Sequence, residues 1–363
     1  MKDIAIITPV GQFNYGNRLQ NYALVRIAEM LGYRVDTLSI EENTKKYWIK
    51  RGLEITSLWP LLLGLHQRER RVDLDWRRYC SFKKFTQKKI PTRYCGPKSI
   101  SGLPNEYRYF LIGSDQIWNP KQLARDCDFA DFAQAGQKVP VAPSFGVSQL
   151  PEQQYERIKT KLNAFCYLSA RENSGVRLIE EMTGRKAQLL IDPTAVLSCS
   201  DWRDISVKPR KVDTDKPYIL TYFLGGKNAE AKRQVKDIAR DTDCEIYPLL
   251  DKSRPELYVS GPAEFLWLIE HAKLVCTDSF HAVMFSVLFG RPFIVYQRDG
   301  DGAGMEDRIA TLLQIFHLEN RLPGCVKHKD IFLCDYTDTN MVLERERKAF
   351  LRYLEKAGIG ANI

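Results

Sequence analysis

Polar side chains are concentrated in residues 14–20, a short segment that follows the apolar run of residues 4–7. Gly16 can bend the chain there, and Asn17 can cap the helix that the downstream sequence predicts. The free N–H groups of a helix N-terminus favour an anion or a polar hydroxyl. We therefore predict that Asn14, Asn17 and Gln20 contact a ligand, although an ordinary capped turn would account for the same residues.

A second polar segment, residues 113–120, follows the apolar run of residues 109–112. Ser114, Asp115 and Gln116 can bind sugar hydroxyls there, and the ring of Trp118 can pack on the face of a pyranose. Asp115 can also act as a base toward an attacking hydroxyl. The same aspartate can instead cap a helix, so both interpretations stay open.

Residues 169–175 place two opposite charges at the end of another predicted strand. Arg171 can bind a phosphate or a carboxylate through two parallel hydrogen bonds. Glu172 can contact a substrate hydroxyl, or it can neutralise Arg171 in a structural ion pair.

His281 lies where a predicted strand runs into a helix, in a chain that contains only five histidines. Imidazole exchanges protons near neutral pH, and the first turn of a helix favours an anion beside it. A single histidine is more often structural, but the position after a strand, beside Asp278 and Ser279, favours a functional role. Residues 298–304 form a glycine-rich loop ahead of Arg308, which can add positive charge to the same region, although a plain loop is an equal explanation.

Strands and helices alternate along the chain, which is typical of parallel sheets covered by helices on both faces. The expected strands are residues 4–7, 33–40, 109–112, 139–143, 165–169, 187–191, 218–224, 245–249, 274–277 and 293–296. The expected helices are residues 17–31, 152–163, 174–183, 229–240, 262–271, 279–288, 308–316 and 340–356. We predict an α/β protein with two Rossmann-like domains that face a cleft. All the polar segments follow strands, where such sheets bind ligands.

The predicted domains divide the chain at a polar stretch with two prolines. Residues 1–200 form the first domain, 201–216 a linker and 217–335 the second domain. Residues 336–363 contain a terminal helix that is expected to pack back on the first domain.

Bulk composition is that of an ordinary globular protein, with 44% hydrophobic and 27% charged residues. The nine cysteines are odd in number and form no CxxC pair, which favours reduced thiols in the cytoplasm over disulfides or a zinc site. We expect no signal peptide, no membrane span, no metal cluster and no cofactor.

Positive charge is concentrated in residues 68–89, which hold nine Arg or Lys against three acids in a chain of net charge +9. The apolar and aromatic residues 58–63 precede this run, so residues 58–89 can rest on an anionic membrane surface at the inner face. A solvated helix face remains the alternative. Trp76, Tyr79, Phe82 and Phe85 recur at helical spacing and are expected to pack on the core, which argues against a nucleic-acid partner.

Seven segments together resemble the polysaccharide pyruvyl transferase family. These segments are residues 14–24, 110–120, 143–146, 169–175, 190–197, 261–296 and 306–321. The resemblance implies a fold like the GT-B glycosyltransferases. It also implies transfer of pyruvate from phosphoenolpyruvate, a co-substrate, onto two hydroxyls of a sugar, which forms a cyclic ketal. The implied acceptor is a bacterial surface glycan or its lipid-linked precursor.

One departure from the family concerns the donor site. Members of the family carry an Arg-Leu-His triplet in which the arginine and the histidine are assigned to the donor, whereas this chain has Ser279, Phe280 and His281. Another cation must then bind the donor, and the candidates are Arg308, Arg171 and Arg18. A different donor is the alternative.

The resulting hypothesis makes His281 the acid that protonates C3 of phosphoenolpyruvate. Asp115 or Glu172 would orient or deprotonate the acceptor, while Ser279, Asp278, Arg171 and Arg308 would hold the donor. Asn14, Asn17, Gln20, Ser114, Gln116 and Trp118 would contact the acceptor. A nucleotide-sugar glycosyltransferase of the GT-B type and a non-catalytic glycan-binding protein are the rival interpretations.

Overall fold

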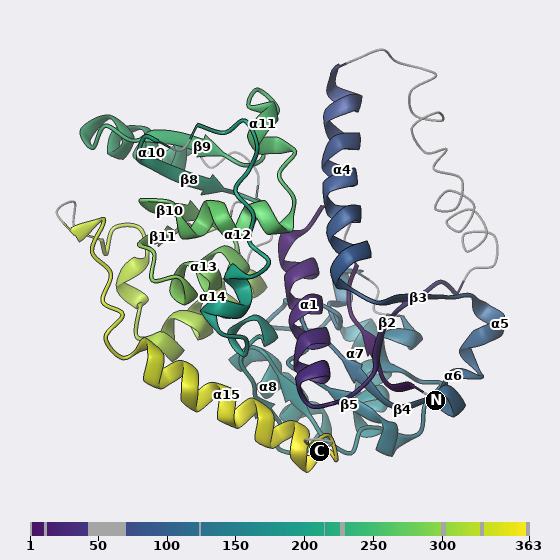
Figure 1. Ribbon diagram of the computed structural model, residues 1–363. Helices are drawn as coiled ribbons and strands as arrows, with labels where there is room; N and C mark the ends of the chain where they lie inside the picture. Colours follow the sequence, from purple (N-terminus) through teal and green to yellow (C-terminus); the bar gives the residue numbers. More distant parts are fainter. Residues whose placement is uncertain are drawn as a thin grey trace.

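Five parallel strands form the sheet of the N-terminal half (Figure 1). The computed structural model describes residues 2–10, 13–42, 70–122, 125–213, 215–225, 229–298, 303–326 and 330–360. The five strands are β1 (Lys2–Ile7), β2 (Val35–Ile40), β3 (Thr92–Cys95), β4 (Tyr107–Ile112) and β5 (Lys138–Pro140). Their order is β3-β2-β1-β4-β5, the strand order of a Rossmann sheet, which reverses between β1 and β4.

Helices and a second, two-stranded parallel sheet complete this half. The small sheet pairs β6 (Ser169–Ala170) with β7 (Gln188–Leu189). The helices are α1 (Tyr15–Met30), α4 (Arg70–Lys89), α5 (Pro97–Ile100), α6 (Leu103–Glu106), α7 (Glu152–Asn163), α8 (Asn173–Thr183) and α9 (Cys199–Arg203). Ile4, Ala5 and Ile6 are fully buried, because helices cover both faces of a parallel sheet.

The C-terminal half contains a four-stranded parallel sheet in the order β11-β10-β8-β9. Its strands are β8 (Tyr218–Tyr222), β9 (Glu245–Pro248), β10 (Leu274–Thr277) and β11 (Phe293–Val295). Its helices are α10 (Ala229–Asp241), α11 (Pro255–Tyr258), α12 (Pro262–Glu270), α13 (Phe280–Leu288) and α14 (Ala303–Phe316). The strand order reverses between β8 and β10, so each half has a switch point at which ligands bind in such folds.

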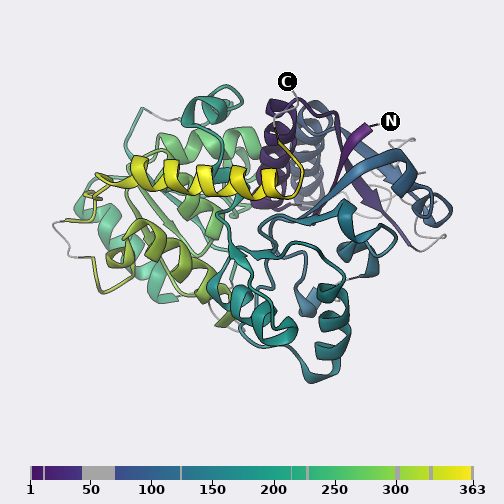
Figure 2. The same cartoon turned by 90° about the horizontal axis from the view of Figure 1, so that it is seen from below.

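The last helix, α15 (Thr339–Lys356), runs back along the molecule toward the N-terminal sheet, and Figure 2 shows it in yellow. The Tyr353 hydroxyl donates to the Pro140 carbonyl at 2.7 Å, and the Tyr109 hydroxyl donates to the Gly358 carbonyl at 2.9 Å. Arg347 donates to the carbonyls of Ala195 and Leu197. The chain end is therefore tied to the N-terminal half.

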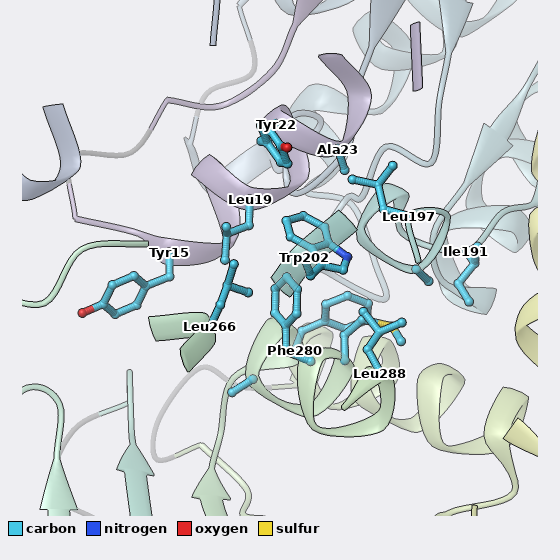
Figure 3. Packing of buried hydrophobic residues seen from close by; sticks show 14 of the residues in the cluster. Tyr15, Leu19, Tyr22, Ala23, Ile191, Leu197, Trp202, Leu266, Phe280 and Leu288 are labelled. Carbon is cyan, nitrogen blue, oxygen red and sulfur yellow. The ribbon is translucent and has the colours of Figure 1, made fainter. Parts of the chain in front are cut away.

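A single hydrophobic cluster joins the two halves, and Figure 3 shows part of it. Trp202 is its central residue, because its ring packs on Tyr22 of α1 and on Phe285 of α13. The side chain is 0% exposed. Residues 201–216 were predicted to be a linker, and three of them, Trp202, Ile205 and Val212, belong to this cluster. These three apolar residues are isolated in a stretch rich in charges and prolines, so no periodic pattern in the sequence indicated their burial.

Helix α4 connects the basic run to the rest of the fold. Its Phe82 and Phe85 are buried against rings of α1, as their helical spacing predicts. Arg78 is also buried, with its guanidinium within 5.0 Å of the ring centroids of Tyr15 and Tyr258, so this cation lies inside the protein and not on a solvated face. Residues 58–69 of the predicted membrane contact lie outside the described residues, and no helix in the described ranges is long and apolar enough to cross a bilayer.

Two differences from the predicted elements have a local cause. The edge strand β3 was not predicted, because its sequence Thr-Arg-Tyr-Cys has little apolar character. The strand expected at residues 165–169 is reduced to Ser169–Ala170, and Phe165 instead packs in the core against Trp118.

Candidate active site

His281 lies at the switch point of the C-terminal sheet, in the first turn of α13. Strand β10 ends at Thr277, whose hydroxyl accepts a hydrogen bond from the Ser279 amide at 3.0 Å and so turns the chain into the helix. The imidazole is buried against Gly16 of α1, where a Cβ would collide with Nδ1. Gly16 therefore lets the two halves meet at the histidine.

Asp192 is the carboxylate beside His281. Its Oδ2 lies 3.6 Å from His281 Nε2, which is an ion-pair distance and longer than a hydrogen bond. Asp192 also accepts from Arg171 at 2.5 Å, from Ser114 Oγ at 3.2 Å and from the Thr194 amide at 3.0 Å. Burial opposes ionisation of Asp192, but His281, Arg171 and these donors outweigh it and lower its pKa.

Asp115 follows β4 and is the second buried carboxylate. Its Oδ1 accepts from Arg171 at 3.1 Å and lies 3.7 Å from Arg308, while Asn17 of α1 donates to its other oxygen. Burial raises the pKa of Asp115, and the charges of Arg171, His281 and Arg308 outweigh that effect, so the pKa is lowered. Asp115 is thus an ionised group that accepts hydrogen bonds.

Arg308 of α14 is the cation of this cluster whose charge is least neutralised by nearby carboxylates. Burial, together with repulsion from Arg171 and Arg298, lowers the pKa of Arg308 to about 10 even though Asp115 and Glu172 act in the opposite sense. The amide oxygen of Gln116, turned toward Arg308, accepts from both Nη atoms at 2.5 and 2.8 Å. Arg308 Nε is buried and has no hydrogen-bond partner in the described part of the chain. An anion beside this guanidinium would therefore be attracted to it.

Arg171 has a different environment from the one predicted. It was expected to bind the donor or to pair with Glu172, but its Nη atoms bind Asp192 and Asp115. Its guanidinium also lies 4.3 Å above the Phe280 ring. Arg171 therefore holds the two carboxylates together, because its planar fork can engage one of them on each side.

Glu172 points toward the backbone and away from the carboxylate cluster. Its Oε1 accepts from the amides of Phe145 at 2.9 Å and Gly146 at 3.4 Å. Burial raises the pKa of Glu172, and Arg171 and Arg308 offset this only in part. The fully buried side chain holds the loop after β5, and contact with an acceptor stays a prediction.

Three other predicted acceptor residues have structural partners. Asn14 caps α1 by accepting from the Asn17 amide at 3.2 Å. The Gln20 amide, which is fully buried, donates to Thr8 and accepts from the Ser114 amide at 3.0 Å. Ser114 Oγ donates to the Ala142 carbonyl at 2.8 Å. These side chains fix the loop that presents Asp115.

Trp118 does not form a sugar platform, and that prediction is wrong. Its side chain is 0% exposed and is stacked on Phe129 with the ring centroids 5.5 Å apart. Phe145 and Phe165 pack on it as well. Its indole N–H donates to the Asp128 carbonyl at 3.3 Å. The ring is therefore packed, and its polar atom is hydrogen-bonded, inside the core.

Asp278 and Arg298 form a second charged group beside His281. Asp278 accepts from the amides of Leu224 and Gly225, each at 2.7 Å, and so positions the loop after β8. Arg298 donates to the Asp278 carbonyl at 3.2 Å, and its Nε lies 3.4 Å from the Asp278 carboxylate. A cavity of about 310 Å³ lies between this group and α14.

Sequence reasoning missed Asp192 as a site residue. Asp192 follows the apolar residues Leu190 and Ile191, so the rule that found the other polar segments would also have found it. Arg298 begins the glycine-rich loop that was singled out at residues 298–304, but no role was assigned to its side chain, and Asp299 to Gly302 of that loop lie outside the described residues. In contrast, Arg18 was a candidate for the donor but neighbours Tyr79 and Tyr94 instead of this cluster.

Comparison with known proteins connects this geometry to a family. A family model described as polysaccharide pyruvyl transferase matches residues 14–300. Among solved structures, Anabaena HepE in complex with UDP-glucose is 10% identical, with 97% of this chain and 99% of that chain covered and a TM-score of 0.50. UDP-GlcNAc 2-epimerase from Neisseria meningitidis is 8% identical, with 98% and 100% covered and a TM-score of 0.48. MurG from Acinetobacter baumannii is 11% identical, with 99% and 92% covered and a TM-score of 0.39.

The solved structures and the family model support different conclusions about this chain. No curated protein matches the chain. At 10% identity the HepE structure shows the fold alone, and the two facing Rossmann-like halves confirm the predicted GT-B-like architecture. The family model covers most of the sequence, including Asp115, Asp192 and His281. The chain belongs to the polysaccharide pyruvyl transferase family and is a transferase.

Proposed function

We propose that this transferase moves pyruvate from phosphoenolpyruvate onto two hydroxyls of a sugar in a surface glycan or its lipid-linked precursor, so that a cyclic ketal forms. The observation that supports this proposal most is that His281 and the incompletely compensated Arg308 both lie near the same carboxylate, Asp115. An imidazole can supply the proton that an enol ether requires, and a desolvated guanidinium attracts the phosphate that must leave. The carboxylate of Asp192 lies 3.6 Å from Nε2 of His281, close enough to orient the ring.

The reaction is balanced without an external oxidant or reductant. His281 donates a proton to C3 of the donor, which becomes a methyl group, while C2 becomes electron-poor. The first sugar hydroxyl attacks C2, then the C2–O bond to phosphate breaks and the second hydroxyl attacks. One hydroxyl proton replaces the proton that His281 gave up, and the other leaves with the phosphate.

Asp115 is assigned to the acceptor in this scheme. Its lowered pKa makes it a weak base, so it orients a hydroxyl by accepting a hydrogen bond and removes no proton in the ground state. Asn17 donates to the same carboxylate and would lie beside the acceptor. Neutral His281, formed in the first step, then takes the proton of the attacking hydroxyl.

The donor is assigned to Arg308, Ser279 and Arg298. Ser279 takes the position of the family's arginine, and Arg298 is held beside it by the Asp278 carbonyl. Arg298 also repels Arg308 electrostatically, so the two guanidinium groups lie near each other and could bind the same anion. Arg171 is occupied by two carboxylates and has the role of holding Asp115 and Asp192 in place.

Ligand-dependent thermal unfolding tests the donor. Phosphoenolpyruvate should stabilise the protein by about 2.7 kcal/mol at a hundredfold excess over Kd. His281→Gln should remain folded, bind the donor and show no turnover. Protection by UDP-sugars with none by phosphoenolpyruvate would support a nucleotide-sugar glycosyltransferase instead. Near-normal turnover by a folded His281→Gln protein would remove His281 from the chemistry.

A further inference from the structure

Arg18 is a buried cation for which the described part of the chain supplies no counter-charge. Its side chain belongs to α1 and is 8% exposed. Its Nε and Nη1 atoms are buried, and within the described ranges neither has a hydrogen-bond partner and no carboxylate pairs with the guanidinium. Burying an unpaired charge costs free energy. Such a group in a folded protein therefore indicates that a bound group supplies the missing counter-charge and hydrogen-bond acceptors.

The neighbours of Arg18 are two phenols from different elements. Tyr79 belongs to α4 and Tyr94 to β3, and both interact electrostatically with the guanidinium. Burial lowers the pKa of Arg18 to about 10 in spite of them. Phenol hydroxyls can donate hydrogen bonds to phosphate oxygens, and a guanidinium adds charge-assisted ones, which makes this set of donors suitable for an anion.

Aromatic and basic side chains continue the same surface along α4. The ring centroids of Trp76 and Tyr79 are 5.3 Å apart, and both side chains are half-buried. Lys83 Nζ lies 5.8 Å above the Tyr79 ring. Tyr94 is 37% exposed, so solvent reaches the group from the β3 side. A ring pair next to cations can hold a sugar face beside a phosphate.

This group is separate from the His281 cluster. Gly16 and Arg18 are two residues apart on α1, which places them about 200° apart around the helix axis. Gly16 contacts His281, whereas Arg18 interacts electrostatically with Tyr79 and Tyr94. The anion that completes Arg18 is therefore a second anion, different from one bound at Arg308.

We propose that Arg18, Tyr79 and Tyr94 bind a phosphate group carried by the acceptor, and that Trp76 and Tyr79 contact its adjoining sugar. The existence of the anion site stands on the uncompensated cation alone. Its assignment to the acceptor rests on the proposed function. The chemistry recognised is a phosphate or diphosphate ester.

Stability without ligand gives the first test. Arg18→Gln removes an unpaired buried charge, so it should raise Tm in an anion-free buffer. Pyrophosphate at millimolar concentration should raise Tm of the wild type and leave Arg18→Gln unchanged. Arg26→Gln is the matched control on the same helix, because Arg26 is exposed and pairs with Glu29; it should respond to pyrophosphate like the wild type. A lower Tm for Arg18→Gln in anion-free buffer would assign Arg18 a structural role and overturn the proposal.

Calorimetric titration in an Arg308→Gln background separates the two anion sites. Pyrophosphate should still bind to Arg308→Gln, and adding Arg18→Gln should weaken this binding by at least about tenfold. Loss of all pyrophosphate binding in Arg308→Gln alone would mean that Arg18 binds no anion. Wild-type protein that binds pyrophosphate through Arg18 but ignores phosphoenolpyruvate would contradict the proposed function and leave the anion site intact.

Two soluble esters identify the carrier of the phosphate. Glucose 1-phosphate should protect the wild type in an Arg18-dependent manner, and Trp76→Ala should weaken its binding more than that of inorganic phosphate. Arg18-dependent protection by UDP with none by glucose 1-phosphate would assign the site to a nucleotide and overturn the assignment to the acceptor.

Discussion

The imidazole of His281 and the backbone of Gly16 are in direct contact, although they belong to different halves of the molecule. A Cβ at residue 16 would overlap Nδ1, Cε1 and Cγ of the ring. The neighbouring Asn17 holds Asp115 through a hydrogen bond. The first turn of α1 therefore sets the separation between the proposed acid and the residue proposed to orient the acceptor.

Gly16→Ala should move His281 or α1, and so reduce kcat/KM by about 100-fold, because displacements of about 1 Å have that effect on catalysis. The clash should also cost about 1–3 kcal/mol of unfolding free energy. Steady-state kinetics and urea unfolding measure the two effects. Gly136→Ala is the control, since a Cβ there meets no atom within 4 Å. Wild-type kinetics in Gly16→Ala would show that the contact has no role in positioning His281.

Asp192→Asn should lower kcat by about 10²- to 10⁴-fold, the usual contribution of acid–base groups, since His281 loses its carboxylate. It should also destabilise the protein by about 3 kcal/mol at pH 7, because Arg171 loses one of its two partners. Because the pKa of Asp192 is lowered in the folded protein, the ionised carboxylate stabilises the fold at pH values above its pKa in the unfolded chain. This contribution to the free energy of unfolding is lost progressively as the pH falls below about 4. The difference between wild type and variant in chemical denaturation should therefore shrink toward pH 3. The exposed Asp204→Asn serves as control, and a difference that stays constant with pH would argue against an ionised Asp192.

Glu172→Gln should make the protein more stable at pH 8 and leave it nearly unchanged at pH 4. The raised pKa of Glu172 means that the folded protein holds this proton more tightly than the unfolded chain. Stability is then lost as pH rises from about 4.3 toward the folded value, by about 1.4 kcal/mol per pH unit. The amide oxygen of Gln can keep the bonds to Phe145 and Gly146. Denaturation curves at both pH values measure the free energy of unfolding, with the exposed Glu181→Gln as control. If the fold required the carboxylate itself, Glu172→Gln would be less stable than the wild type at both pH values.

Trp118→Ala should destabilise the protein by about 3–5 kcal/mol, because a fully buried aromatic side chain leaves a cavity. Trp118→Phe should keep the acceptor KM, since the ring has no free face for a sugar. Thermal unfolding and acceptor titrations separate the two effects. A folded Trp118→Phe protein with a tenfold higher acceptor KM would restore the sugar-platform interpretation.

Arg298→Gln should raise the KM for phosphoenolpyruvate by about tenfold or more and leave the acceptor KM unchanged, because charge-assisted contacts to an anion contribute at least this much. Steady-state kinetics with each substrate varied in turn provide the measurement. Arg240→Gln is a suitable control, since its side chain is 72% exposed. Equal effects on both substrates would indicate that Arg298 only supports the loop after β8.

The alternation of strands and helices was predictable because hydrophobic periodicity is a local property. Helix Glu152–Asn163 and strand Leu274–Thr277 were predicted with the observed bounds. Trp202 was not predicted as core, since one apolar residue in a charged stretch has no periodicity. Trp118 was assigned to a ligand because an aromatic residue near polar ones has the same local signature whether it faces a cleft or a core.

The sequence by itself determined which segments meet at the carboxyl ends of the strands. Parallel strands end on one edge of a sheet, so the residues that follow them converge, and Asn17, Asp115, Arg171 and His281 do lie in one cluster. Only the tertiary structure decided the pairs: His281 with Asp192, Arg171 between two carboxylates, and Arg18 with no carboxylate among the residues that the structure describes. The physical reason is that periodicity specifies the face of an element, whereas charge compensation depends on which faces of distant elements meet.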